Sequence, residues 1–306
     1  MATLLQKAND IVRVLDSSVD TFFEALPASE KKLYSEILSL IKELKVTKGN
    51  IAVSVTNIRL INKLRPLIEN VLQRNKHLKD VGAFIKTYDT VTKAQNEYFS
   101  LIASKFKPPK LLKEVKKQAI NETIDGLTER GLGNVVTDEL TQILKQNIES
   151  GGSYAKFTEQ LRESILGTPD EDGIMARNSR TFVTDTLNQY SATYSKTITD
   201  DLGLVWYQYV GSLITTSREF CIHLVGKRYV HESEITGIIN GKIDGEKVSL
   251  AGLIPDTTKD NFPILRGGYN CRHQMLAVSE ATVPKKVRIE LYEKQGIEFD
   301  EDGFAV

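Results

Sequence analysis

Two short segments, far apart in the sequence, each carry a cysteine and a histidine separated by one residue. Cys221 precedes His223 in SREFCIHLVGKRY, and Cys271 precedes His273 in RGGYNCRHQMLAVSE. Two thiols and two imidazoles are the ligand set of a tetrahedral structural zinc site. One intervening residue is a tight spacing, but on a strand the side chains of residues i and i+2 share a face. The sequence therefore indicates Cys221, His223, Cys271 and His273 as candidate zinc ligands.

Two other states of the cysteines stay open beside zinc. Cys221 and Cys271 are the two cysteines of the chain, so a disulfide between them is the second alternative. Buried, unligated thiols are the third. His231 is a spare candidate ligand. Apart from a structural zinc, we expect no cofactor.

The same residues do not form a pattern typical of an enzyme. Neighbours on one strand seldom make a Cys–His dyad, and no orienting Asn or Asp is identifiable beside Cys221 and His223. No HExxH or GxSxG motif occurs in the chain. The pair Gly267-Gly268 lies outside a phosphate-binding loop context and is predicted to permit a tight turn. We therefore expect no catalytic activity.

Arg218 and Arg272 stand close to the two cysteines in the sequence. Two guanidinium groups are able to bind phosphate, but Arg also holds backbone carbonyls or a carboxylate such as that of Glu219. We favour the second role, in which both arginines close a small domain. Trp206 belongs to an aromatic stretch, and we interpret it as a core residue rather than a base-stacking surface.

Composition excludes several classes of protein. The chain has 306 residues, 41% hydrophobic and 26% charged, which is typical of a globular protein of about two domains. Two cysteines are too few for a disulfide-rich secreted scaffold. The N-terminus lacks a signal-peptide pattern, and no stretch reaches the roughly 18 apolar residues of a membrane span. We expect a protein made in a reducing cytoplasm, with no membrane partner.

Charge is segregated along the chain although it balances overall, with 40 Lys and Arg against 40 Asp and Glu. Residues 41–120 contain 17 Lys and Arg against 6 Asp and Glu. Such a segment either contacts the phosphate backbone of nucleic acid or forms solvated helix faces. Packaged DNA is therefore a candidate partner of the basic 41–120 segment.

The elements that position these residues are predicted to be helical up to Gly203 and mixed beyond it. The predicted helices are 29–46, with Ser29 as N-cap, 50–76, kinked at Pro66, 80–105, a helix from Leu111 to the glycines of RGLGN, 136–149, 154–165 and 174–202. Strands are predicted in LVWYQYVGSLI and at 227–230, 247–254 and 274–278. The predicted fold is mainly α with a smaller α+β C-terminal domain, a long helical arm followed by a small antiparallel-sheet domain.

Four features of the C-terminal third occur in a fixed order: an Arg-Thr helix, an aromatic strand, an Arg-x-x-Cys segment that ends in Gly-Lys, and a final Asn-Cys-Arg-His. The residues are Arg180-Thr181, Asn188, Trp206, Arg218, Cys221, Gly226-Lys227 and Asn270-Cys271-Arg272-His273. Together they resemble the phage Mu F-like minor head protein (head morphogenesis) family, over roughly residues 110–282. Many members have Cys-x-x-Cys and Cys-Arg-Cys, where this chain has Cys221-Ile222-His223 and Cys271-Arg272-His273.

The resemblance implies a structural minor head protein of a tailed bacteriophage that acts in capsid assembly near the portal. Its implied partners are the portal protein and other capsid proteins, and its implied location is the virion, after assembly in the host cytoplasm. The alternatives are a metal-dependent enzyme or toxin-like effector, and a DNA-binding head-interior protein. Only about thirty residues follow Val278, too few for an added catalytic domain.

We expect four regions along the chain. Residues 1–107 form a helical N-terminal region, and residues 108–203 form the helical part of the region that resembles the Mu F-like family. Residues 204–282 form a small α+β domain with the paired Cys/His segments, and residues 283–306 form an acidic C-terminal tail. Lys107-Pro108-Pro109 stops any helix, and we interpret it as a hinge.

Overall fold

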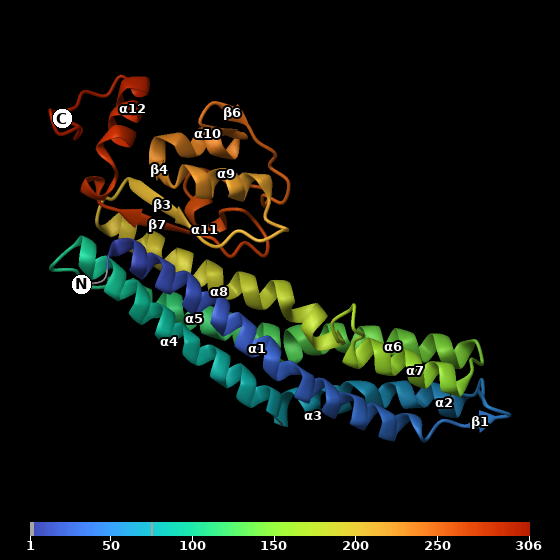
Figure 1. The fold of residues 1–306 in the computed structure, drawn as a ribbon. Coiled ribbons are helices and arrows are strands. Elements are labelled where there is room, and N and C mark those ends of the chain that lie inside the picture. Colours follow the sequence, from blue (N-terminus) through green and yellow to red (C-terminus); the bar gives the residue numbers. More distant parts are fainter. Residues whose placement is uncertain (1–2, 75) are drawn as a thin grey trace. The chain divides into compact units, whose positions relative to one another are not determined.

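The structure is a computed structural model that describes residues 3–74 and 76–306. Its first two thirds are helical (Figure 1), with helices α1 (Leu4–Ile41), α2 (Val55–Leu60), α3 (Leu64–Arg74), α4 (Lys76–Ile102), α5 (Leu111–Leu127), α6 (Asn134–Glu149), α7 (Tyr154–Leu166) and α8 (Ile174–Asp201). Small antiparallel sheets follow in the C-terminal part, so the predicted fold class is confirmed. Among the described residues, no helix combines the length and apolar character that crossing a membrane requires.

The chain forms two compact units whose segments alternate along the sequence. One unit comprises residues 1–16, 88–119 and 184–306, and the other comprises residues 17–87 and 120–183. The boundaries between them fall inside α1, α4, α5 and α8. All the candidate ligands belong to the first unit, so its elements are the ones that position the site. The four regions expected from the sequence stay a prediction.

Helix α1 begins earlier than the sequence predicts. Ser29 is not an N-cap, because α1 runs unbroken from Leu4 to Ile41 with Pro27 inside it. A proline inside a helix removes one backbone hydrogen bond. Leu26 and Leu33, on either side, are at most 1% exposed, and their burial stabilises the helix on both sides of Pro27. Tertiary packing therefore outweighs the local stop signal at this position.

The predicted helix over 50–76 is divided. Residues Val46–Thr47 and Asn50–Ile51 form the hairpin strands β1 and β2, and the short α2 is followed by a 3₁₀ turn over Ile61–Lys63 and then by α3. Pro66 lies in the first turn of α3, where its missing N–H has no intrahelical partner to lose. The break at Lys107-Pro108-Pro109 is confirmed, since α4 ends at Ile102 and α5 begins at Leu111.

A three-stranded antiparallel sheet forms the centre of the C-terminal part. Its strands are β3 (Trp206–Val210), β4 (Tyr229–His231) and β7 (Gln274–Val278), in the order β4-β3-β7. Tyr209 pairs with Met275 across β3 and β7. All five residues of β3 and all five of β7 are buried, so this sheet is a core element.

Short elements connect these strands. They are α9 (Glu219–Lys227), α10 (Ile235–Ile239), the hairpin strands β5 (Lys242–Ile243) and β6 (Glu246–Lys247), and α11 (Phe262–Leu265). The strand predicted at 274–278 is confirmed as β7. The one predicted at 247–254 is wrong beyond Lys247, because a turn with Gly252 at φ +86° occupies that stretch.

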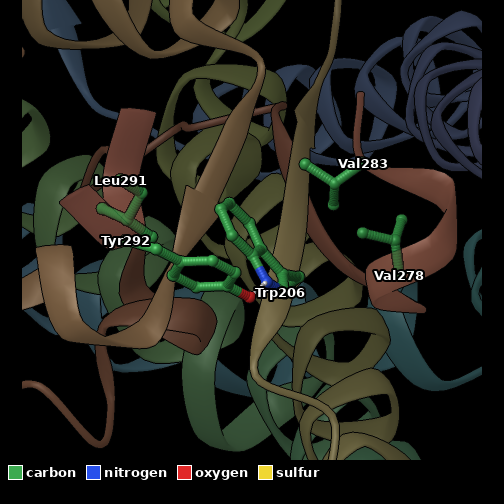
Figure 2. Close-up of a cluster of buried hydrophobic side chains, with 5 residues drawn as sticks. All are labelled: Trp206, Val278, Val283, Leu291 and Tyr292. Atoms are coloured by element: carbon green, nitrogen blue, oxygen red, sulfur yellow. Dashed lines mark hydrogen bonds between the residues drawn. The ribbon is translucent and has the colours of Figure 1, made fainter. Parts of the chain in front are cut away.

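The predicted acidic tail contains a folded helix, α12 (Lys285–Gln295). Its Leu291 and Tyr292 pack with Trp206, Val278 and Val283 in a buried cluster (Figure 2). The indole N–H of Trp206 donates to the Tyr292 hydroxyl at 3.2 Å. Trp206 is 1% exposed, which confirms its interpretation as a core residue.

Candidate metal centre

The structure brings three of the four predicted ligands together. The Sγ atoms of Cys221 and Cys271 and a ring nitrogen of His273 all lie within 4.8 Å of one another. Cys221 lies in the first turn of α9, while Cys271 and His273 lie in the loop between α11 and β7. The three residues are 3%, 3% and 5% exposed, respectively. The two segments therefore meet in one closed, buried cluster.

Tyr209 is a fourth member of this cluster that sequence reasoning missed. Its hydroxyl oxygen lies 3.6 Å from Sγ of Cys221 and 3.8 Å from Sγ of Cys271. Its ring stacks on that of His273, with centroids 5.4 Å apart and an interplanar angle of 21°. Nδ1 of His273 lies 3.8 Å from Sγ of Cys271. No spacing in the sequence marks Tyr209, because only the sheet brings it to the cysteines.

His223 lies outside the cluster. The segment around Cys221 is helical, and two residues along a helix correspond to a rotation of about 200°, so the two side chains leave opposite faces. The imidazole of His223 is about one-third exposed and faces carboxylates, with 3.6 Å from Nδ1 to Glu246 and 4.0 Å from Nε2 to Glu219. The tight Cys-x-His spacing would have suited a strand, and the helix removes that possibility for His223.

His231, the spare candidate, has a structural role instead. Its Nδ1 lies 2.7 Å from Oγ of Ser233 and caps a short 3₁₀ turn. Its ring meets the edge of Trp206 with centroids 4.8 Å apart. Burial lowers its pKa below the ordinary value, the largest effect on this group. The neutral form of this half-buried ring is therefore favoured.

Two glycines leave room for the cluster. A Cβ atom on Gly267 would lie 2.5 Å from Sγ of Cys221 and 2.9 Å from Sγ of Cys271. A Cβ atom on Gly211 would lie 2.6 Å from Cδ2 of His273. All three distances are far below van der Waals contact, so any larger residue would push the ligands apart. The tight turn predicted at Gly267-Gly268 thus also serves to admit the sulfur atoms.

Helix α8 holds both ends of the loop that carries Cys271 and His273. The side-chain carbonyl of Asn188 accepts from Nε2 of Gln274 at 2.8 Å, and its backbone carbonyl accepts from Nη1 of Arg266 at 3.3 Å. Asn188, Gln274 and Arg266 are each at most 2% exposed. One buried asparagine therefore accepts hydrogen bonds from both ends of the loop from residue 266 to 274.

Asp185, one turn earlier on α8, holds the middle of the same loop. Its Oδ1 accepts from the backbone N–H of Asn270 at 2.6 Å. Asn270 has a positive φ of 57°, a conformation that Asn tolerates better than most residues. Burial raises the pKa of Asp185 from 3.8 to about 6, against the opposing effect of the Asn270 hydrogen bond.

The predicted backbone-holding role of Arg218 is confirmed. Nη1 donates to the carbonyl of Gly267 at 2.8 Å and Nη2 donates to the carbonyl of Tyr269 at 2.7 Å. The two planar N–H groups thus connect the start of α9 to the Cys271 loop. Arg272 makes the other predicted kind of contact, an ion pair of 3.7 Å with Asp16. Both arginines are thus engaged in contacts that hold this loop in place, as predicted, and not in a phosphate-binding site.

The pKa values of the two thiols shift in opposite directions. The pKa of the Cys271 thiol lies well below its ordinary value, first because Cys221 donates a hydrogen bond to it, and further because His273 and Arg266 stabilise the thiolate. The pKa of the Cys221 thiol is raised, since it is the donor in that pair and is also buried. The guanidinium of Arg266 is 2% exposed, and a buried cation favours an anion nearby. The site is therefore suited to at least one thiolate.

Closed burial and two neighbouring sulfurs leave two kinds of chemistry for this cluster. A soft metal ion would find two thiolates and an imidazole, and an oxidant would find two thiols whose sulfur atoms lie within 4.8 Å of each other. Both cysteines are free in this structure. Comparison with known proteins adds nothing to this assignment: no family model, no curated protein and no solved structure matches the chain.

Proposed function

We propose that this chain is a structural minor head protein of a tailed bacteriophage that acts in capsid assembly near the portal. One observation carries the proposal: five of the motif residues that resemble the Mu F-like family, Asn188, Arg218, Cys221, Cys271 and His273, meet at a single site. Asn188 brackets the loop that carries Cys271, Arg218 holds its carbonyls, and Cys221 faces Cys271 across Gly267. Residues that form one family motif are expected to meet in this way, although they are spread along the sequence.

We further infer that the site holds a structural zinc ion through Cys221, Cys271 and His273. The donor set supports this, because two thiolates and an imidazole match the preferences of zinc. A reducing cytoplasm would keep the two thiols from closing a disulfide during assembly. Nε2 of His273 is buried and has no hydrogen-bond partner in the part of the chain that the structure describes. Nδ1 of the ring lies 3.8 Å from Sγ of Cys271, so the orientation of the ring suits ligation through Nδ1.

The role of this zinc would be structural. It would join the short helix α9 to the irregular loop between α11 and β7. Structural zinc sites contribute directly to folding stability. A virion protein that must withstand assembly and DNA packaging would gain a fixed C-terminal unit from such a link. The partners we propose for this chain are the portal protein and other capsid proteins.

A second candidate function is contact with packaged DNA, and exposed lysines around the turn between α4 and α5 favour it. Lys105, Lys107, Lys110, Lys113 and Lys117 are exposed, whereas Lys116 is bound to Asp89. Exposed cations in one stretch of the chain can contact phosphates without reading sequence. This function is compatible with a place inside the head and does not require the zinc site.

Mass spectrometry of purified, DNA-filled particles of the phage that encodes this chain tests the virion assignment. We expect peptides of this chain at a few copies per particle, together with chemical cross-links to the portal protein. Particles assembled without the gene serve as the control for contaminating host-cell protein. Absence of these peptides from complete virions would rule out a structural virion role.

A further inference from the structure

We propose that Tyr209 completes the metal centre, with its phenol oxygen as the fourth ligand beside Cys221, Cys271 and His273. This inference rests on the zinc site proposed above and replaces the predicted fourth ligand, His223. The resulting set is two sulfurs, one nitrogen and one oxygen, contributed by β3, α9 and the loop before β7.

Three distances between the candidate ligand atoms suit a tetrahedron. With metal–sulfur bonds of about 2.3 Å and metal–oxygen or metal–nitrogen bonds of about 2.0 Å, a sulfur–oxygen or sulfur–nitrogen edge is about 3.5 Å. The hydroxyl oxygen of Tyr209 lies 3.6 Å and 3.8 Å from the two sulfurs, and Nδ1 of His273 lies 3.8 Å from Sγ of Cys271. These three of the six edges are each within about 0.3 Å of the tetrahedral value.

Burial explains why the fourth ligand would come from the protein. Structural zinc sites are closed and four-coordinate, while an open position is typical of catalytic sites. Tyr209 is 1% exposed, and the other three residues are at most 5% exposed. The Tyr209 hydroxyl contacts both sulfurs, whereas the imidazole of His223 faces Glu219 and Glu246 instead.

Burial and both cysteines hold the pKa of the Tyr209 phenol well above its ordinary value in the metal-free chain, so the phenolate would form only with the ion, where it balances the local charges. A divalent ion with two thiolates, one phenolate and a neutral imidazole carries one net negative charge, and Asp185 adds a second. Two arginines stabilise the negative charge on these groups. Arg218 acts electrostatically on Cys221, and Arg266 acts on Cys271 and Asp185. Two positive charges therefore offset two negative ones in a buried environment, where an unbalanced charge is costly. On metal binding, the phenol proton and the thiol protons pass to solvent.

Zinc titration of the purified full-length chain tests this, read out by metal content and by the ultraviolet difference spectrum of tyrosinate. We expect about one zinc per wild-type chain and a tyrosinate signal that rises with the zinc added. Tyr209→Phe should lose that signal and bind zinc more weakly by a factor on the order of 10 to 100. Cobalt(II) in place of zinc should show a changed ligand-field spectrum in the same variant.

Tyr207→Phe is the matched control. Tyr207 lies on the same strand, is 4% exposed, and has no contact with either sulfur among the described residues. It should retain both the zinc affinity and the tyrosinate signal of the wild type. One outcome would overturn the role of Tyr209 but leave the zinc site standing. In it, the wild type binds zinc without a tyrosinate signal, and Tyr209→Phe binds zinc with equal affinity. A wild-type chain that binds no zinc would overturn the proposed zinc site and this inference together.

Discussion

Nε2 of Gln274, the first residue of β7, donates a 2.8 Å hydrogen bond to the side-chain carbonyl of Asn188 on α8. Both residues are at most 1% exposed. Asn188 also donates from Nδ2 to the carbonyl of Thr184 at 2.8 Å, which fixes the orientation of its amide. The start of β7 is thereby tied to α8, and with it the loop that carries Cys271 and His273.

Asn188→Ala should lower the free energy of unfolding by about 1–3 kcal/mol, because it leaves the buried amide of Gln274 without its acceptor. Urea denaturation measures the change. Gln189→Ala is the control, since residue 189 is half-buried and lies next to Asn188 on the same helix. Equal stability of the Asn188→Ala variant and the wild type would show that the hydrogen bond from Gln274 to Asn188 does not stabilise the loop.

Gly267→Ala should disrupt the cluster by steric overlap. The added methyl group would lie 2.5 Å from Sγ of Cys221, and overpacking of this kind costs about 1–3 kcal/mol. Zinc affinity and thermal stability should both fall. Gly226→Ala is the matched control: a Cβ atom there meets nothing within 4 Å, and alanine in α9 should stabilise the helix by about 0.5–1 kcal/mol. Unchanged zinc affinity in Gly267→Ala would contradict the packing described here.

Glu30 should make the stability of the second unit depend on pH. Its Oε1 accepts from the backbone N–H groups of Met175 and Ala176 at 3.0 and 3.1 Å, yet burial raises its pKa above the ordinary 4.5. A raised folded-state pKa means that the protonated form contributes stability that is fully present below the ordinary pKa of 4.5 and is lost as pH rises through the folded pKa.

Glu30→Gln keeps an acceptor oxygen but cannot ionise, so that decline should disappear in the variant. Urea denaturation across about pH 4 to 8 measures it. Glu24→Gln, at an exposed position of the same helix, should retain the wild-type profile. Identical pH profiles for Glu30→Gln and the wild type would mean that the carboxyl group of Glu30 does not titrate in this range.

Exposed lysines between α4 and α5 should give weak duplex DNA binding without sequence preference. Affinity should fall steeply with salt, and removing Lys107 and Lys110 should reduce the log–log salt slope by about 0.9 for each lost phosphate contact. Fluorescence anisotropy at several salt concentrations measures the slope. The paired control removes Lys286 and Lys294, which are exposed on α12. Equal salt slopes for the two double variants would show that Lys107 and Lys110 do not contact DNA and only form a solvated surface.

Regular elements were largely predictable from the sequence, because their apolar spacing is long and periodic. Helix α8 was predicted over 174–202 and spans Ile174–Asp201, and β7 was predicted over its five residues. The start of α1 was not predictable, since packing around Pro27 decides it.

The sequence predicts part of the site. Cys221, Cys271 and His273 could be chosen by residue type, because soft ligands are rare in this chain. His223 was placed wrongly, because helix or strand decides where its side chain points, and that segment is helical. Tyr209 could not be found at all: its contact with the sulfurs depends on the register of β3 against β7.

Zinc content of the purified chain, measured by elemental analysis with His223→Ala and His273→Ala in parallel, tests the metal centre most directly. We predict about one zinc in the wild type and in His223→Ala, whose imidazole is partly exposed beside two carboxylates, and a loss of zinc in His273→Ala. Absence of zinc from the wild type, or its loss in His223→Ala and retention in His273→Ala, would contradict the centre built from Cys221, Cys271 and His273.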